Sequence, residues 1–333
     1  MEILSASDLD LEKAAAALAG GFLVAFPTET VYGLGADAFN VSALARIFEA
    51  KNRPRFDPLI IHIAEFGALS RIADTSSLDG AARERLSILS QGLWPGPLTL
   101  ILPKRGELPA LATAGLDTAA VRFPSHPVAQ KLISLSTGAV AAPSANPFGY
   151  LSPTRAEHVK AQLGEKVDFI IDGGKTTVGL ESTVLDLSHG IPRILRPGGT
   201  SRETIEALIG PVELPGDPEA RQENHATPLS PGQLKSHYAP RTPLILCRRE
   251  ELLSLPDAPG EGRLYFSSPE HSAAADRTRV LSASGDLAEA AANLFEMLHE
   301  LDNLGLDLIR AEKAPRFGLG AAINDRLKRA AKQ

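Results

Sequence analysis

The chain has 333 residues, of which 44% are hydrophobic and 22% are charged, and its formal net charge is −6. A chain this long and this apolar buries at least one full core, which excludes a disordered or fibrous protein and slightly favours two domains over one. The acidic balance argues against a protein that grips long nucleic acid, because such binding depends on neutralising many phosphates. A small anionic ligand is compatible with this charge, since it needs only a few cations gathered at one point.

We expect neither a targeting signal nor a membrane-spanning helix. The first residues are acidic rather than basic, and no apolar run approaches the roughly 20 residues that a membrane-spanning helix needs. Cys247 is the single cysteine, which excludes an internal disulfide and a thiolate metal cluster and fits a reducing cytoplasm. We therefore expect a cytoplasmic protein in which Cys247 is buried in a strand.

Apolar β-rich runs alternate with helical patterns through roughly the first two hundred residues, which is typical of a layered α/β domain. Helices are expected over 8–19 and 41–50, where apolar residues recur on one face. Thr154 and Thr200 each precede a glutamate with capping-box spacing, which predicts a helix start at both. Strands are expected at 22–26, 59–63, 98–102, 119–123, 139–142, 167–171, 182–187 and 194–196.

The periodic pattern dissolves between Pro211 and Pro243 into a stretch that is typical of a linker. A second, shorter α/β series follows, with strands near 244–247 and 263–266 and a long amphipathic helix that ends at Gly305. We therefore divide the chain into a domain over 1–210, a linker over 211–242 and a smaller α/β domain over 243–333.

Two nucleotide-binding motifs are incomplete. Residues 33–38 fit a dinucleotide fingerprint, but they begin seven residues after the expected strand ends, where the fingerprint requires an immediate turn into a helix. Gly174-Lys175-Thr176 resembles the end of a P-loop, yet Phe169 stands at the place of the first glycine. The chain also lacks the Gly-x-Ser-x-Gly and His-Glu-x-x-His motifs, so the sequence offers no nucleophile motif for a hydrolase and no ligand motif for a zinc protease.

Short polar stretches follow the expected strands and helices, at positions where open α/β sheets hold ligands. Taken singly, each has an ordinary explanation. His62 could be a half-buried histidine whose hydrogen bonds are made within the protein, and Arg122 and Arg196 could be solvated or ion-paired at strand ends. Taken together, four cations beside hydroxyls and an amide provide the charged and neutral donors that a triphosphate requires. The stretches are 27–35, 51–54, 57–62, 94–99, 113–122, 142–146, 181–184 and 196–198.

Together these segments resemble the YrdC/Sua5 family of threonylcarbamoyl-AMP synthases, in its longer, two-domain Sua5 form. The resemblance implies an α/β fold: a YrdC-like twisted, mixed and mostly parallel open sheet with flanking helices, plus a smaller, Rossmann-like C-terminal Sua5 domain. It rests on PTETVYGLG at 27–35, Lys51 and Arg53, PLIIHI at 58–63, WPGPLT at 94–99, TAGLDT at 113–118, VRFPSHP at 121–127, Ser144 and Asn146, ESTV at 181–184, LRPG at 195–198 and SPGQLKSHYAP at 230–240.

The activity that the resemblance implies is a nucleotidyltransferase reaction. ATP, L-threonine and bicarbonate would give threonylcarbamoyl-AMP and pyrophosphate, with Mg²⁺ arriving on the nucleotide because the chain shows no carboxylate cluster of its own for a metal. The product would pass to a separate tRNA threonylcarbamoyltransferase complex, which modifies adenosine 37 of tRNAs that read ANN codons. We expect no stable binding to nucleic acid or membranes.

The resemblance also divides the site residues between two ligands. Residues 230–240 of the linker would form a lid that excludes water from a hydrolysable product. Asp57 departs from the family, where asparagine is common, and its charge near a triphosphate needs Mg²⁺ or a neighbouring arginine to offset it. The implied ATP-binding residues are Lys51, Arg53, Asp57, Thr118, Ser144, Asn146, Ser152, Arg196 and Tyr238, of which Lys51, Arg53, Ser144 and Asn146 are the catalytic candidates; the implied threonine-binding residues are Thr28, Thr30, His62, Arg122, Ala142 and Ser182.

Two other functions compete with the synthase hypothesis. An RNA-binding ribosome or tRNA maturation factor without catalysis is the main alternative, and the acidic balance weighs against it. A carbamoyltransferase related to hydrogenase maturation proteins is the other, but those proteins carry acylphosphatase-like and zinc-finger regions that a chain with one cysteine lacks. For the synthase we assign no general base, because the attacking carbamate is already anionic, and we expect cations and positioning to supply the catalysis.

Overall fold

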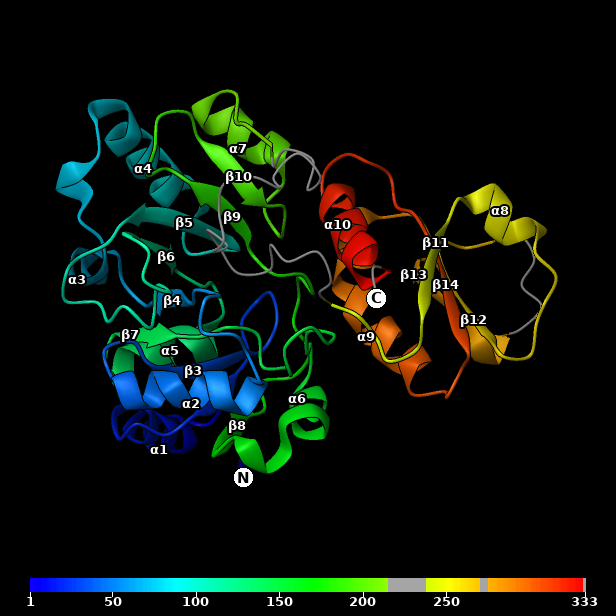
Figure 1. Ribbon diagram of the computed structural model, residues 1–333, viewed down its shortest axis with the longest axis horizontal. Coiled ribbons are helices and arrows are strands. Elements are labelled where there is room, and N and C mark those ends of the chain that lie inside the picture. Colours follow the sequence, from blue (N-terminus) through cyan, green and yellow to red (C-terminus); the bar gives the residue numbers. More distant parts are fainter. Residues whose placement is uncertain (215–237, 270–274, 332–333) are drawn as a thin grey trace.

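The computed structural model describes residues 1–214, 238–269 and 275–331. Two sheets organise the described chain (Figure 1): a ten-stranded sheet, which with its helices we call the N-terminal domain, and a four-stranded sheet, which with its helices we call the C-terminal domain. The expected α/β fold with a second, smaller domain is thus confirmed. Most of the predicted linker, including the predicted lid up to residue 237, lies outside the described residues.

The ten-stranded sheet has the order β1-β8-β2-β3-β7-β4-β6-β5-β9-β10. The pairs β1–β8, β2–β8, β4–β6 and β5–β9 are parallel, and the other neighbours are antiparallel. The sheet is therefore mixed, as expected, with parallel and antiparallel pairs in nearly equal number. Its strands are β1 (Glu2–Leu4), β2 (Val24–Phe26), β3 (Gly33–Asp37), β4 (Ile60–Ile63), β5 (Leu98–Pro103), β6 (Thr118–Arg122), β7 (Ala139–Ala141), β8 (Phe169–Ile171), β9 (Thr183–Asp186) and β10 (Arg193–Arg196).

All eight strands expected in this domain form, but β1 and β3 were not expected. The first residues of β3 belong to the polar stretch 27–35, where no strand was expected. In the structure Gly35 lies in β3, where a Cβ would come within 2.8 Å of the Phe26 ring and 3.0 Å of Val140 Cγ1. The glycine therefore allows close packing within the sheet rather than access for a ligand.

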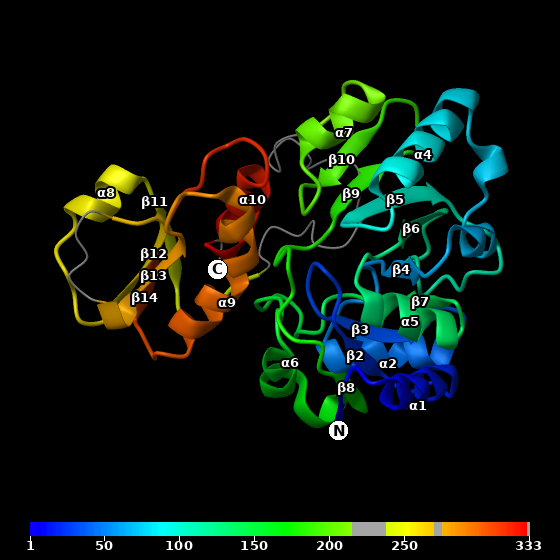
Figure 2. The same cartoon turned by 180° about the vertical axis from the view of Figure 1, so that it is seen from behind.

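Helices cover both faces of the ten-stranded sheet (Figure 2). On one face α1 (Asp8–Ala19) packs against α5 (Pro127–Leu135). The helices that pack into the core on the other face are α2 (Val41–Lys51), α3 (Leu69–Ile72), α4 (Gly80–Leu93), α6 (Ala156–Leu163) and α7 (Arg202–Ile209). Short 3₁₀ turns lie at η1 (Phe66–Ala68), η2 (Thr75–Ser77) and η3 (Gly164–Lys166).

The two helices expected near the N-terminus are confirmed as α1 and α2, but both capping-box predictions are wrong by one residue. Arg155, not Thr154, precedes α6, and Ser201, not Thr200, is the N-cap of α7. The Thr200 amide instead donates to Thr183 Oγ1 of β9 at 3.1 Å. A long-range contact has therefore overridden the local capping signal at Thr200.

The C-terminal domain is built on a wholly parallel sheet with the order β11-β14-β12-β13, and its buried Cys247 lies in a strand as expected. In both views α9 and α10 lie on the side that faces the N-terminal domain, and α8 lies on the far side (Figures 1 and 2). Its elements are β11 (Leu244–Cys247), α8 (Arg249–Ser254), β12 (Glu261–Ser267), η4 (Ala275–Arg277), β13 (Thr278–Ser282), α9 (Leu287–Asp302), β14 (Leu308–Glu312) and α10 (Gly320–Ala330).

Candidate active site

A pocket lies against β4 and β6 of the large sheet. Its walls come from segments far apart in sequence: the β2–β3 turn, the ends of β6 and β10, the residues after β7, and the residues before β9. The lining residues are Thr28, Thr30, Val31, Gly33, Arg53, Ile60, His62, Arg122, Ala142, Pro143, Ser144, Glu181, Ser182, Arg196 and Tyr238.

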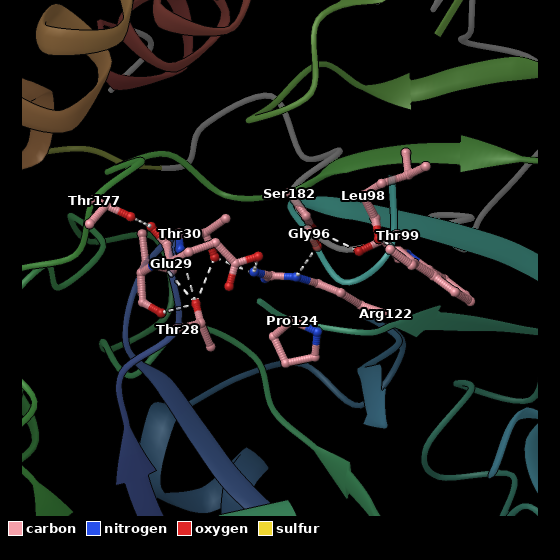
Figure 3. Close-up of polar contacts among 12 residues, drawn as sticks. Thr28, Glu29, Thr30, Gly96, Leu98, Thr99, Arg122, Pro124, Thr177 and Ser182 are labelled. Carbon is pink, nitrogen blue, oxygen red and sulfur yellow. Dashed lines mark hydrogen bonds and ion pairs between the residues drawn. The ribbon is translucent and has the colours of Figure 1, made fainter. Parts of the chain in front are cut away.

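One corner of the pocket is built around Arg122, the last residue of β6 (Figure 3). Its Nη2 lies 2.7 Å from Glu29 Oε1, and its Nη1 donates to Thr30 Oγ1 at 2.8 Å. Thr28 Oγ1 lies 2.8 Å from Thr30 Oγ1 and donates to the Val31 carbonyl at 2.7 Å. Burial alone would raise the pKa of Glu29, but Arg122 lowers it below its ordinary value, so this corner is a buried, ionised pair.

Ser182 links this corner to Arg196 at the end of β10. Ser182 Oγ lies 2.7 Å from Thr99 Oγ1 of β5 (Figure 3). Arg196 donates to the Ser182 carbonyl from Nη2 at 2.9 Å and from Nε at 3.2 Å, and to Ser182 Oγ from Nη2 at 3.2 Å. The Arg196 side chain is buried, so these contacts fix a guanidinium group in the pocket wall.

A third arginine of the pocket, Arg53, follows α2. Arg53 Nη2 lies 2.9 Å from Asp57 Oδ2 and donates to the Pro58 carbonyl at 2.8 Å. Burial raises the pKa of Asp57 even though Arg53 acts in the opposite direction. Of the two partners left open for Asp57 by the sequence, the structure provides the neighbouring arginine.

Lys51, the last residue of α2, lies behind the pocket wall. Its Nζ donates to the Ser144 carbonyl at 2.6 Å and to the Asn146 carbonyl. Burial lowers the pKa of Lys51 well below its ordinary value, and the positive charge of Arg53 adds a smaller effect in the same direction. The Asn146 amide donates to the carbonyls of Pro147 and Tyr150, each at 2.9 Å, so Lys51 and Asn146 together hold the loop that carries Ser144.

His62 adds a neutral polar group beside Arg122. It alternates with apolar neighbours in β4, and its Nδ1 lies 3.2 Å from the Ile60 carbonyl. Burial and then Arg122 lower its pKa to about 3. His62 is therefore uncharged at neutral pH and cannot itself attract an anion.

Glu181 and Tyr238 complete the lining. Ser152 Oγ donates to Glu181 Oε1 behind the wall. The Tyr238 side chain is buried, and its backbone is left-handed with φ of 64°. Burial raises the pKa of Tyr238, and the nearby Glu181 carboxylate acts in the same direction, so the phenol is neutral at physiological pH.

The structure brings most of the predicted site residues together. Ten of them line the pocket: Thr28, Thr30, Arg53, His62, Arg122, Ala142, Ser144, Ser182, Arg196 and Tyr238. Lys51, Asp57, Asn146 and Ser152 lie behind the wall, each in contact with a lining residue or with the loop that carries one.

Thr118 is the exception among the predicted residues. It is the first residue of β6, whereas Arg122 at the other end of that strand lines the pocket. Four steps along a strand separate the two positions by about 13 Å. The structure therefore does not bring Thr118 to the pocket.

Two carboxylates of the site, Glu29 and Glu181, received no role from the sequence. Glu29 pairs with Arg122, and Glu181 lines the pocket. Both lie inside motifs that carry the family resemblance, so their position within PTETVYGLG and ESTV was the available signal.

Two features are absent from residues 1–214, 238–269 and 275–331. No helix in these ranges is long and apolar enough to cross a membrane. Nor do these ranges contain a group of three or more His, Cys, Asp and Glu side chains arranged to hold a metal ion.

Family models match the chain in two adjacent parts. Residues 16–198 match the Sua5/YciO/YrdC family, described as "Telomere recombination". Residues 200–332 match the family described as "Threonylcarbamoyl-AMP synthase, C-terminal domain".

Curated relatives and a solved structure cover nearly the whole chain. A threonylcarbamoyl-AMP synthase of Bacillus subtilis is 43% identical over 98% of this chain and 94% of its own length. One of Pyrococcus abyssi is 44% identical over 93% of this chain and 90% of its own length. The crystal structure of P. abyssi Sua5 complexed with L-threonine superposes with a TM-score of 0.88 at 40% identity, covering 99% of this chain and 98% of that one. The chain thus belongs to the threonylcarbamoyl-AMP synthase family, in its two-domain Sua5 form.

Proposed function

We propose that this chain is an L-threonylcarbamoyladenylate synthase that acts in the pocket described above. The observation that carries the proposal is the convergence of Arg53, Arg122 and Arg196, with hydroxyl groups between them, on one pocket. A relative with the same fold was crystallised with L-threonine. The main chemical obstacle is to bring two anions together, and fixed cations in a buried pocket reduce it.

The two ligands divide between two parts of the pocket. Arg122, with Thr28, Thr30, His62, Ala142 and Ser182 around it, binds threonine, and the guanidinium group takes the carboxylate. Arg53 and Arg196, with Ser144 and Tyr238, bind ATP. Lys51 acts from behind the loop that carries Ser144, and a bound phosphate raises the pKa of Lys51 again because an opposite charge favours the protonated form.

The reaction has two bond-forming steps. The neutral amine nitrogen of threonine attacks the carbon of bicarbonate or CO₂ and becomes a carbamate. With bicarbonate the amine proton leaves in the water that is released, and with CO₂ it passes to solvent. A carbamate oxygen then attacks the α-phosphorus of ATP, and the bond from that phosphorus to the oxygen that bridges to the β-phosphorus breaks. The adenylyl group is transferred, pyrophosphate leaves, and no side chain needs to accept a proton in this second step.

The family resemblance implies both Mg²⁺ and a later partner. Mg²⁺ would be held by the nucleotide phosphates and would supply positive charge there, since the cation prefers phosphate oxygens and water to a dedicated protein cage. The mixed anhydride is hydrolysable, and it passes to a separate tRNA threonylcarbamoyltransferase complex in the cytoplasm.

The test is pyrophosphate release by the full-length chain with ATP, L-threonine and bicarbonate, omitting each in turn, with mass-spectrometric detection of threonylcarbamoyl-AMP. We expect release to require all three substrates. Arg196→Ala should abolish most of it, whereas Arg193→Ala, which removes an exposed arginine of the same strand paired with Glu213, should retain it. Pyrophosphate release that ignores threonine would overturn the proposal.

The RNA-binding alternative has a separate readout. A maturation factor would bind tRNA with an affinity that falls steeply as salt rises. We expect no such binding at physiological salt in the preparation that makes the adenylate.

A further inference from the structure

A buried arginine of the C-terminal domain reaches the pocket wall. Arg326 lies in α10, its side chain is fully buried, and its Nε lies 2.7 Å from Glu181 Oε2. Its guanidinium carbon lies 4.9 Å from the centre of the Tyr238 ring. Glu181 and Tyr238 both line the pocket. Arg326 also pairs with Asp325 of α10, with 2.6 Å between Arg326 Nη1 and Asp325 Oδ2. Arg326 itself was not a candidate from the sequence.

The first consequence concerns the charge of Glu181. This carboxylate is buried, its other oxygen accepts from Ser152 Oγ, and it faces a pocket whose proposed occupant carries a triphosphate. An uncompensated negative charge there repels the nucleotide, and the repulsion is strong because the wall has a low dielectric constant. The salt bridge with Arg326 reduces that repulsion, and the charge of Arg196 acts on Glu181 in the same direction.

The second consequence concerns the Tyr238 ring. A guanidinium group packed near an aromatic face is attracted to it, and more strongly where water is excluded. Tyr238 is buried against both Arg326 and Phe295, whose ring centre lies 5.7 Å from that of Tyr238. The C-terminal domain therefore packs behind a pocket-lining side chain that precedes its own first strand.

We propose that Arg326 is a positioning residue for ATP: it neutralises Glu181 and supports Tyr238, so that the C-terminal domain completes the nucleotide side of the pocket. The inference rests on the proposed synthase function and adds to it a role for the C-terminal domain in ATP affinity. It predicts an effect on ATP and not on threonine, because the threonine corner is built from Arg122 and the β2–β3 turn.

The experiment compares Arg326→Gln with Lys328→Gln in the full-length chain, by measuring KM for ATP and for threonine. Lys328 is an exposed cation on the same helix, so the control loses the same formal charge without touching Glu181. We expect Arg326→Gln to raise the KM for ATP about tenfold, equivalent to about 1.4 kcal/mol, with little change in the KM for threonine. Arg326→Lys should recover part of the loss, since it restores the charge but not the planar group.

A second variant separates charge from folding. Glu181→Gln combined with Arg326→Gln removes the unpaired carboxylate, and we expect the KM for ATP to return to within about threefold of wild type, a non-additive result for two contacting residues. A general folding defect would instead raise both KM values and would not be rescued.

Three outcomes overturn the inference: an unchanged KM for ATP in Arg326→Gln, equal effects in the Lys328→Gln control, or no rescue in the double variant. If the wild-type chain makes no threonylcarbamoyl-AMP, the proposed function itself fails. Failure of the proposed function is distinguishable from failure of this inference, because the Arg326 variants are compared only with a wild-type chain that is active.

Discussion

At the scale of single residues, the site depends on how its arginines are paired. Arg122 is bound to Glu29 and Thr30, and Arg53 is bound to Asp57. A guanidinium group has five N–H donors, so it can bind one protein carboxylate and still donate to a ligand. In each pair the carboxylate holds the guanidinium group in place and reduces the net positive charge there. Such a site favours a ligand that fits its geometry over anions in general.

Arg122 and Glu29 give a test at this scale. Arg122→Ala should raise the KM for threonine by about tenfold or more and leave the KM for ATP close to wild type, because the threonine carboxylate loses its cation and meets an unpaired Glu29. The measurement is steady-state kinetics with each substrate varied in turn. Equal changes in both KM values would refute this division of labour.

Glu29→Gln is the matched control for that test. It releases Arg122 from its buried partner but keeps the cation. We expect the KM for threonine in this variant to stay at or below the wild-type value, and a rise as large as that of Arg122→Ala would contradict the assignment.

At the scale of elements, the pocket is shaped by turns that bring strand ends close together. The turn after β10 passes directly over the residues that precede β9, and the Gly199 amide donates to the Glu181 carbonyl at 2.9 Å. A Cβ at Gly198 would clash with the carbonyl groups of Glu181 and Ser182. The absence of a side chain there allows β10 to present Arg196 beside Ser182.

Gly198→Ala tests this packing. The added methyl group meets backbone rather than a flexible side chain, so we expect a loss of about 1–3 kcal/mol of stability together with weaker ATP binding through displacement of Arg196. Thermal unfolding and the KM for ATP measure the two effects. Gly67→Ala is the control, since a Cβ at Gly67 meets nothing within 4 Å; the idea fails if both variants unfold at the same temperature.

At the scale of the whole molecule, the two domains share a buried core. Val31, Leu151 and Leu180 of the N-terminal domain pack in one cluster with Leu294 and Phe295 of α9. Ion pairs surround this cluster: Glu296 of α9 binds both Arg155 and Lys175. Burial of apolar side chains holds the two domains together, and the surrounding ion pairs determine how one domain is oriented against the other.

A pair of histidines in contact makes this interface sensitive to acid. His299 of α9 lies against His158 of α6, with ring centres 4.2 Å apart, and its Nε2 lies 3.1 Å from the Ser152 carbonyl. Asp302 and Arg241 are the charged groups whose fields also act on it. Burial and then the charge of His158 lower the pKa of His299 to about 3.

The sign of the pH effect follows from that shift. The folded pKa lies below the unfolded value of 6.5, so the unfolded chain binds more protons between the two values and stability falls as the pH drops through this window. At pH 5 the loss from His299 is about 2 kcal/mol. Thermal unfolding at pH 7.5 and 5.0 should show a smaller pH dependence in His299→Gln than in wild type, while the exposed-site variant His189→Gln should keep the wild-type dependence. An equal pH dependence in all three proteins would rule out His299 as the source.

The sequence by itself determined eight of the ten strands of the large sheet and most of the residues around the pocket. Strands such as β4 and β5 are short apolar runs, and local composition alone marks such runs as buried strands. The polar stretches and motifs, from PTETVYGLG to SPGQLKSHYAP, identified ten of the lining side chains because a family resemblance marks residues without needing their contacts.

Only the tertiary structure decided which of these groups pair and which segments pack closely. Arg122 meets Thr30 across 92 positions, and Arg326 meets Glu181 across 145. β3 forms because its glycine fits against Phe26 and Val140, and Thr118 lies away from the pocket because it begins the strand that Arg122 ends. Such contacts depend on how the layers pack, and burial decides their strength, so local sequence patterns cannot determine them.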